Sequence, residues 1–156
     1  MVFYIELCSQ QFLLTFAYLH MNMRCAAGVD GRFDCTKYIA ESAGVKTSSP
    51  SDLASFFMDK GAGACIFKWG EKGSFIKTTD AEFRVPAFKI AVSDTTGCGD
   101  SYCGGFIAGL SLGYDLEAAC KLGTATSGLV ATALGSDAGV VDLATTKQFI
   151  ESTATI

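Results

Sequence analysis

The chain has little histidine, little basic charge and no metal-type cysteine spacing, and each shortage excludes a class of function. The only histidine is His20, which argues against a histidine-based catalytic triad or a zinc site. Twelve lysines and arginines stand against 16 acidic residues, giving a net charge of −4 at pH 7. Since the sequence also has no basic stripe with interleaved aromatics, nucleic acid is not an expected partner.

The cysteines do not form a disulfide framework. There are seven, an odd number, and no pair has the C-x-x-C spacing. We interpret them as reduced, mostly buried thiols, which predicts a cytoplasmic protein. Their positions are Cys8, Cys25, Cys35, Cys65, Cys98, Cys103 and Cys120.

The apolar start of the chain is too interrupted to predict a membrane span. A transmembrane helix needs about 20 predominantly apolar residues, whereas Glu6, Ser9 and His20 break up residues 1–23. A signal peptide begins with a basic region, which is absent here. Residues 1–30 are therefore an unassigned apolar head with three readings: a strand or helix packed on the core, a segment foreign to the fold, or a membrane-associated segment.

Residues 31–156 have the pattern of an α/β domain. Ser49-Pro50-Ser51 is a helix start, and the helix that follows ends near Gly61. Short apolar strands are predicted at 64–67 and 74–77, with an extended segment beginning at 83. Further helices follow residue 100, with the last at about 143–150. Alternation of helices and short strands predicts a layered α/β fold.

The stretch Asp94–Asp100 is the strongest candidate for a functional site. An alternating apolar run at 88–92 predicts a strand before it, and a helical pattern follows it. Strand, glycine turn and helix make an anion site, because the first N–H groups of a helix lack partners and the helix dipole is positive there. We expect the N–H groups of Gly97, Cys98 and Gly99 to be among those unpaired donors.

Two common phosphate motifs are excluded. No G-x-x-x-x-G-K-[S/T] occurs, so the chain is not a P-loop protein. The dinucleotide fingerprint would need a third glycine at position 102, where Tyr102 stands.

Asp-Thr-Thr-Gly-Cys-Gly-Asp at 94–100, followed by Ser-Tyr-Cys-Gly-Gly-Phe, resembles the second signature of the PfkB/ribokinase family of carbohydrate kinases. The resemblance covers roughly residue 53 to the C-terminus. It implies a ribokinase-like (Rossmann-like, three-layer) α/β domain that is partial, since kinases of this family are about twice as long. Residues 31–156 then correspond to the ATP-binding and catalytic half.

The implied activity is ATP-dependent phosphorylation of a small-molecule sugar or sugar-like alcohol, with ATP and Mg²⁺ as cofactors. Asp100 is implied as the base, and Gly97, Cys98 and Gly99 as the anion hole for the transferring phosphoryl group. Without the resemblance, Asp100 is equally an acidic residue favoured at a helix start. Cys98 stands where the family usually has alanine, either as a simple small-residue replacement or as a reactive thiol.

Two further sets of residues take roles from the resemblance. Gly70, Glu71 and Gly73 resemble the family's nucleotide loop, although a lone G-x-x-G also suits an ordinary hairpin turn. Thr124 is implied to face the nucleotide base. Asp94 and Thr96 are implied to hold a monovalent cation such as K⁺, together with backbone near 130, 133 and 135; alternatively, Asp94 is only a turn carboxylate.

The sequence also departs from the family pattern. Relatives carry an N-x-x-E element, but the only asparagine, Asn22, is followed three residues on by Cys25. The family's N-terminal glycine signature and sugar-contacting lid are absent. These departures keep a second reading open: a non-catalytic nucleotide-binding module. Apolar surface exposed in a partial fold would favour self-association, so a homo-oligomer is a further expectation.

Overall fold

The computed structural model describes residues 3–6, 15–18, 40–41 and 43–156, with side chains from residue 40 onward. It separates into two compact units. Unit 1 comprises Met1–Trp69 and Phe75–Phe83, and unit 2 comprises Gly70–Ser74 and Arg84–Ile156. All ten candidate site residues belong to unit 2.

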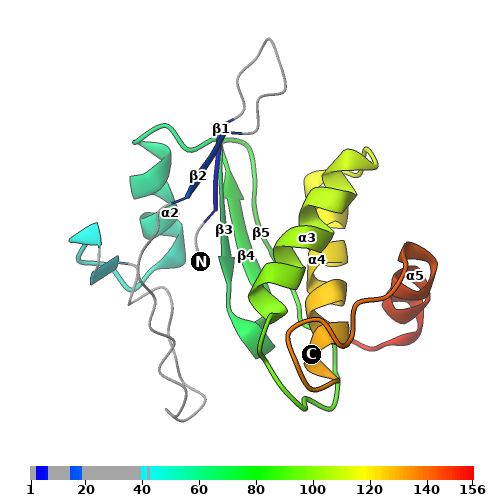
Figure 1. The fold of residues 1–156 in the computed structure, drawn as a ribbon. Helices are drawn as coiled ribbons and strands as arrows, with labels where there is room; N and C mark the ends of the chain where they lie inside the picture. Colours follow the sequence, from blue (N-terminus) through cyan, green and yellow to red (C-terminus); the bar gives the residue numbers. More distant parts are fainter. Residues whose placement is uncertain (1–2, 7–14, 19–39, 42) are drawn as a thin grey trace. The chain divides into compact units, whose positions relative to one another are not determined.

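A five-stranded sheet has the order β2-β1-β3-β4-β5 (Figure 1). Its strands are β1 (Phe3–Glu6), β2 (Thr15–Tyr18), β3 (Ala64–Lys68), β4 (Ser74–Thr78) and β5 (Glu82–Val85). β1 is antiparallel to both β2 and β3. The strands predicted at 64–67 and 74–77 and the extended segment from 83 are confirmed.

The apolar head is described only in part. The described backbone of residues 1–30 consists of the strands β1 and β2. The rest of the head lies outside the described residues, as do these residues named above: Cys8, Ser9, His20, Asn22, Cys25 and Cys35. In the part of the chain that is described, no helix combines the length and apolar character needed to cross a bilayer.

The core of unit 1 forms between α2 (Pro50–Met58) and the sheet. Ser49 caps the helix as predicted, its Oγ accepting the Asp52 N–H at 3.3 Å. The helix buries Leu53 and Phe57 in one cluster with side chains of β3 and β4. Gly61 follows with a φ of +102°, which ends the helix as expected.

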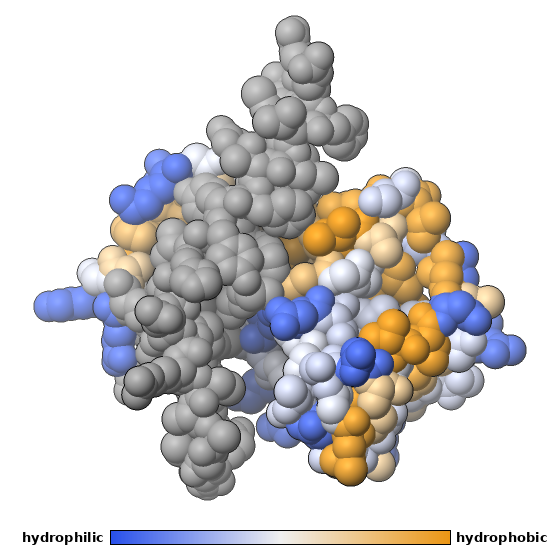
Figure 2. Space-filling model, in the orientation of Figure 1, coloured by the Kyte–Doolittle hydropathy of each residue, from blue (hydrophilic) through white to orange (hydrophobic). Residues whose placement is uncertain are grey.

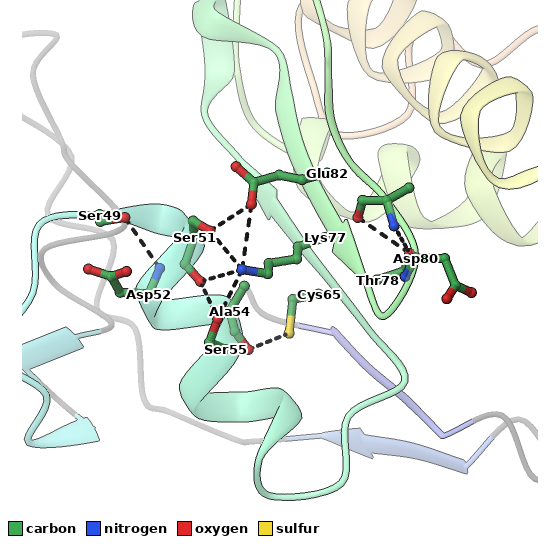
Figure 3. A network of polar contacts seen from close by, with 11 residues as sticks. Ser49, Ser51, Asp52, Ala54, Ser55, Cys65, Lys77, Thr78, Asp80 and Glu82 are labelled. Carbon is green, nitrogen blue, oxygen red and sulfur yellow. Dashed lines mark hydrogen bonds and ion pairs between the residues drawn. The ribbon is translucent and has the colours of Figure 1, made fainter.

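A polar network fastens α2 to β4 and β5 (Figure 3). Lys77 Nζ donates to Ser51 Oγ at 2.7 Å and to Ser55 Oγ at 2.9 Å. Glu82 Oε2 accepts from Ser51 Oγ at 2.6 Å and lies 3.5 Å from Lys77 Nζ. Since the ion pair is partly exposed, it contributes about 1 kcal/mol at most, and the network mainly fixes the position of α2.

Unit 2 is built from η1 (Gly70–Lys72), α3 (Cys98–Ser111), α4 (Leu116–Ala131) and α5 (Leu143–Ser152), and α3 and α4 lie side by side (Figure 1). Two glycines of α3 allow it to pack closely on α4. A Cβ on Gly105 would overlap Thr126, and one on Gly109 would lie 2.9 Å from Ala119 Cα. Gly104, in the same helix, has open space around it.

The strand predicted at 88–92 is wrong for this structure. Among the residues that the structure describes, a single β-bridge forms there, between Phe88 and Thr155. Lys89 N–H donates to Ala154 O at 2.7 Å, and Ile156 N–H donates to Ala87 O at 2.9 Å. Val92 is 61% exposed. The alternating pattern therefore marks an extended segment held by the C-terminal residues, because no longer strand lies beside it among the described residues.

The buried thiol of Cys65 gives unit 1 a predicted sensitivity to alkali. Its Sγ donates to Ala54 O at 3.6 Å, and burial raises its pKa to about 11, partly offset by the charge of Lys77. Since the unfolded chain ionises this thiol first, its stabilising contribution is complete below about pH 9 and is lost as pH rises through the folded pKa.

We therefore expect the free energy of unfolding to fall by about 2 kcal/mol between pH 9 and pH 11 on account of this thiol. Chemical denaturation across that range measures it. Cys65→Val should flatten the dependence by this amount, and an unchanged pH profile in the variant would contradict the assignment.

Candidate active site

The turn before α3 is fixed by Gly97. This residue is the helix N-cap and has a φ of +78°, in the left-handed region that glycine adopts without strain. A Cβ at this position would overlap the backbone carbonyl of Ser136. The chain therefore turns sharply into α3 while the 135–136 backbone lies directly against it.

Asp94 holds the same turn through hydrogen bonds to its carboxylate. Its Oδ1 accepts from Thr96 N at 2.9 Å and from Thr96 Oγ1 at 2.8 Å, while Oδ2 accepts from Gly135 N at 3.0 Å. The N–H of Thr96, followed by that of Gly135 and by the Thr96 hydroxyl, keeps the pKa of Asp94 below its usual value. The carboxylate thus joins two segments 41 residues apart.

The N–H groups at the start of α3 are the structural basis of an anion site. The first helical bond runs from Ser101 N to Gly97 O at 2.9 Å. Within the described part of the chain, the N–H groups of Gly97 and Asp100 meet no acceptor. The expectation is wrong for Cys98, because its N–H donates to Thr95 O at 3.3 Å. The Asp100 N–H is a donor that the sequence reasoning did not name.

Asp100 lies in the first turn of α3, and its side chain is exposed. Among the described residues its carboxylate makes no hydrogen bond or ion pair. A carboxylate that is not committed to an internal partner can accept a proton or a hydrogen bond from a bound molecule. The residue is not turned into the interior, which would have excluded a role as base.

Cys98 is a packing residue more than a nucleophile. Burial raises the pKa of its thiol; a hydrogen bond with Ser127 acts in the opposite direction, and the negative charge of Asp94 raises the pKa again. A reactive cysteine needs a lowered pKa. The raised pKa therefore favours the small-residue replacement over the reactive thiol.

The Gly70–Gly73 segment is a 3₁₀ turn with two left-handed glycines. Gly70 has a φ of +57° and Gly73 a φ of +78°, and Gly73 N–H closes the turn on Gly70 O at 3.0 Å. Glu71 is exposed. A Cβ on Gly73 would overlap Val85 O, so the turn lies tightly against the 85–87 backbone.

Thr124 has the least accessible side chain of the candidates. It is 7% exposed in the middle of α4, and its hydroxyl donates to Cys120 O at 2.9 Å. The hydroxyl is therefore already engaged within the helix.

The described residues offer few side-chain ligands for a metal ion. Among the described residues, no group of three or more His, Cys, Asp or Glu side chains could hold an ion. This fits Mg²⁺ only in its usual form, held by one or two carboxylates together with substrate phosphates. For a monovalent cation, Asp94 already accepts three hydrogen bonds out of about four acceptor positions, which leaves it little further capacity.

A separate hollow of about 320 Å³ lies between α3, α4 and residues 139–146. None of the ten candidate residues lines it, and its walls are mainly apolar, with Leu122, Leu129 and Val140 among them. Apolar patches are also visible on the face of unit 2 in Figure 2, and exposed apolar side chains of that unit include Leu134 and Val140. No motif of the sequence predicts this hollow.

Comparison with known proteins identifies the family. The pattern of the pfkB family of carbohydrate kinases matches residues 37–142, and the chain belongs to this family. The nucleoside kinase of Methanocaldococcus jannaschii is 40% identical over 89 residues, which are 54% of this chain and 30% of that protein.

Solved structures agree with the family and confirm the ribokinase-like α/β fold. A ribokinase from Thermotoga maritima has a TM-score of 0.69 at 26% identity, over 75% of this chain and 39% of that one. A putative ribokinase II from E. coli, in complex with ATP and Mg²⁺, has a TM-score of 0.65 at 28% identity, over 68% and 34% of the two chains. This chain spans about a third of the length of these relatives.

Replacing Asp94 tests whether its charge holds the turn. Asp94→Asn cannot accept all three hydrogen bonds, so we expect a lower melting temperature at pH 7. A lowered pKa stabilises the fold above the unfolded pKa of about 3.9, and this contribution disappears as pH falls through the folded value. The difference in melting temperature between the original chain and Asp94→Asn should therefore shrink between pH 5 and pH 3. Equal melting temperatures at pH 7 would contradict the role.

Replacing Gly97 tests the left-handed cap. Gly97→Ala should cost about 1–2 kcal/mol in backbone strain alone, with the overlap on Ser136 in addition. Gly104→Ala is the matched control, since it lies in the same helix with open space and should be neutral or slightly stabilising. Urea unfolding of both variants measures the difference, and equal stabilities would rule out the cap as a constraint.

Proposed function

We propose that this chain carries the phosphoryl-transfer centre of a carbohydrate kinase that phosphorylates a sugar or sugar-like alcohol with ATP. The observation that carries the proposal is the exposed Asp100 carboxylate, in the first turn of a helix whose first N–H groups include free donors. Membership of the pfkB family supplies the reaction class.

In this reaction Asp100 accepts the proton of the acceptor hydroxyl as that oxygen attacks the γ-phosphorus of ATP. The bond from the γ-phosphorus to the β,γ-bridging oxygen breaks, and ADP leaves. Such a transfer depends on alignment and charge neutralisation more than on covalent chemistry. The start of α3 supplies the charge neutralisation. The backbone of Gly97, Cys98 and Gly99 lies beside the transferring phosphoryl group, and the Asp100 N–H is an added donor.

The nucleotide is assigned to the turn that contains Gly70, Glu71 and Gly73. Its left-handed glycines allow close backbone approach. Glu71 suits the hydroxyl groups of a ribose better than phosphate, because a carboxylate accepts hydrogen bonds and repels an anion. Mg²⁺ would arrive with the phosphates, given the sparse protein ligands. Thr124 has the weakest support, since its hydroxyl is engaged by Cys120 O.

A K⁺ site at Asp94 and Thr96 is a secondary part of the proposal. Asp94 has little acceptor capacity left, whereas Thr96 Oγ1 retains lone pairs after donating its proton to Asp94. The cation would then be held mainly by the threonine hydroxyl and by carbonyl groups near 130–135.

The decisive test is turnover. Asp100→Asn should lower kcat by roughly 10²- to 10⁴-fold and leave the affinity for MgATP nearly unchanged, because the backbone donors remain. Release of ADP, measured with a panel of pentoses, hexoses and nucleosides in Mg²⁺ and K⁺, provides the readout. Asp80→Asn, an exposed aspartate in unit 1, is the control and should leave kcat unchanged.

If kcat of Asp100→Asn stays within about threefold of kcat of the original chain, Asp100 is not the base, because a positioned base contributes much more than this. MgATP binding without turnover on any acceptor would favour the non-catalytic nucleotide-binding module. The absent N-x-x-E element is the feature that supports that second candidate.

A further inference from the structure

Tyr102 and Ser74 form a buried pair that the proposed mechanism does not use. Tyr102 lies two residues after Asp100 and is 5% exposed, while Ser74 follows Gly73 directly and is fully buried. The phenol donates to Ser74 Oγ at 3.1 Å. The pair therefore links the helix of the proposed base to the turn assigned to the nucleotide, across 28 residues of sequence.

A third element meets at the same place. The Cys120 thiol of α4 lies close enough to the phenol of Tyr102 for each group to affect the pKa of the other. Burial raises the pKa of Cys120 to about 11, so this thiol stays neutral at physiological pH. The phenol thus lies where the turn, α3 and α4 come together.

The surroundings leave α3 little freedom to adjust. A Cβ on Gly123 would lie 2.7 Å from Tyr102 O, so the two helix backbones are in close contact there. Thr126 Oγ1 adds a bond across the helices to Ser101 O at 2.8 Å. The turn lies tightly against Val85 O only at its Gly73 end, whereas Gly70, Glu71 and Lys72 are exposed. If the phenol bond is lost, the turn moves more readily than the helix.

We propose that Tyr102 is a positioning residue for nucleotide binding: its hydroxyl, through Ser74, holds the Gly70–Gly73 turn in register with the start of α3. This inference rests on the proposed function for its reference to ATP. Removing the hydroxyl leaves Ser74 Oγ buried without its donor, which is costly. The turn then spends less time in the binding position, and the apparent affinity for nucleotide falls by the same fraction.

The test compares Tyr102→Phe, Ser74→Ala and the double variant, with Tyr114→Phe as the matched control. Tyr114 is a half-buried tyrosine of the same unit that contacts Lys147. Tyr102→Phe keeps the ring and should weaken MgATP binding and raise KM for ATP roughly fivefold, with kcat changed by less than about twofold. The double variant should bind MgATP no more weakly than either single variant, because both substitutions remove the same hydrogen bond. Tyr114→Phe should match the original chain.

A second readout needs no nucleotide. Hydrogen exchange of the Gly73 and Ser74 amides should be roughly fivefold faster in Tyr102→Phe, while amides in the middle of α4 stay unchanged. Unaltered exchange at 73–74, or additive effects of the two single variants, overturns the positioning role. Failure of the original chain to bind MgATP overturns the proposed function instead, and the exchange comparison still decides whether the phenol holds the turn.

Discussion

The candidate site depends on one backbone constraint, the left-handed turn at Gly97 pressed against Ser136. It aims the start of α3 outward, with Asp100 exposed at its first turn. Asp94 fixes the same turn from the other side by accepting from Thr96 and Gly135. A side chain at position 97 would force these segments apart. The unpaired donors and the exposed carboxylate are therefore consequences of a glycine and a turn carboxylate acting together.

The starts of the helices could be predicted because the residues that mark them are neighbours in the sequence. Ser49 and Pro50 mark the start of α2, and Gly97 followed by the helical pattern marks the start of α3. The error at 88–92 has a physical cause: alternation of apolar residues predicts an extended backbone but not the presence of a neighbouring strand. Here that backbone pairs with residues 154–156 instead.

The contacts that organise the site could not be predicted. The bond of Asp94 to Gly135 and that of Tyr102 to Ser74 join residues 41 and 28 positions apart, and no spacing rule connects them. The acceptor of the Cys98 N–H is likewise a matter of turn geometry. The ligand roles follow from resemblance to a family, and the structure adds how each side chain is engaged: Asp100 is exposed, Asp94 is hydrogen-bonded within its turn, and Thr124 is hydrogen-bonded within its helix.

The central claim is that the start of α3 receives the terminal phosphate of a nucleotide. Amide chemical shifts, followed by NMR in ¹⁵N-labelled chain during titration with MgATP and with MgADP, test it directly. The account predicts that the amides of residues 97–100 shift strongly with MgATP and much less with MgADP, since only ATP has the γ-phosphate. The amides of residues 70–73 should shift by similar amounts with MgATP and with MgADP. Equal responses at 97–100, or none with MgATP, would contradict the account.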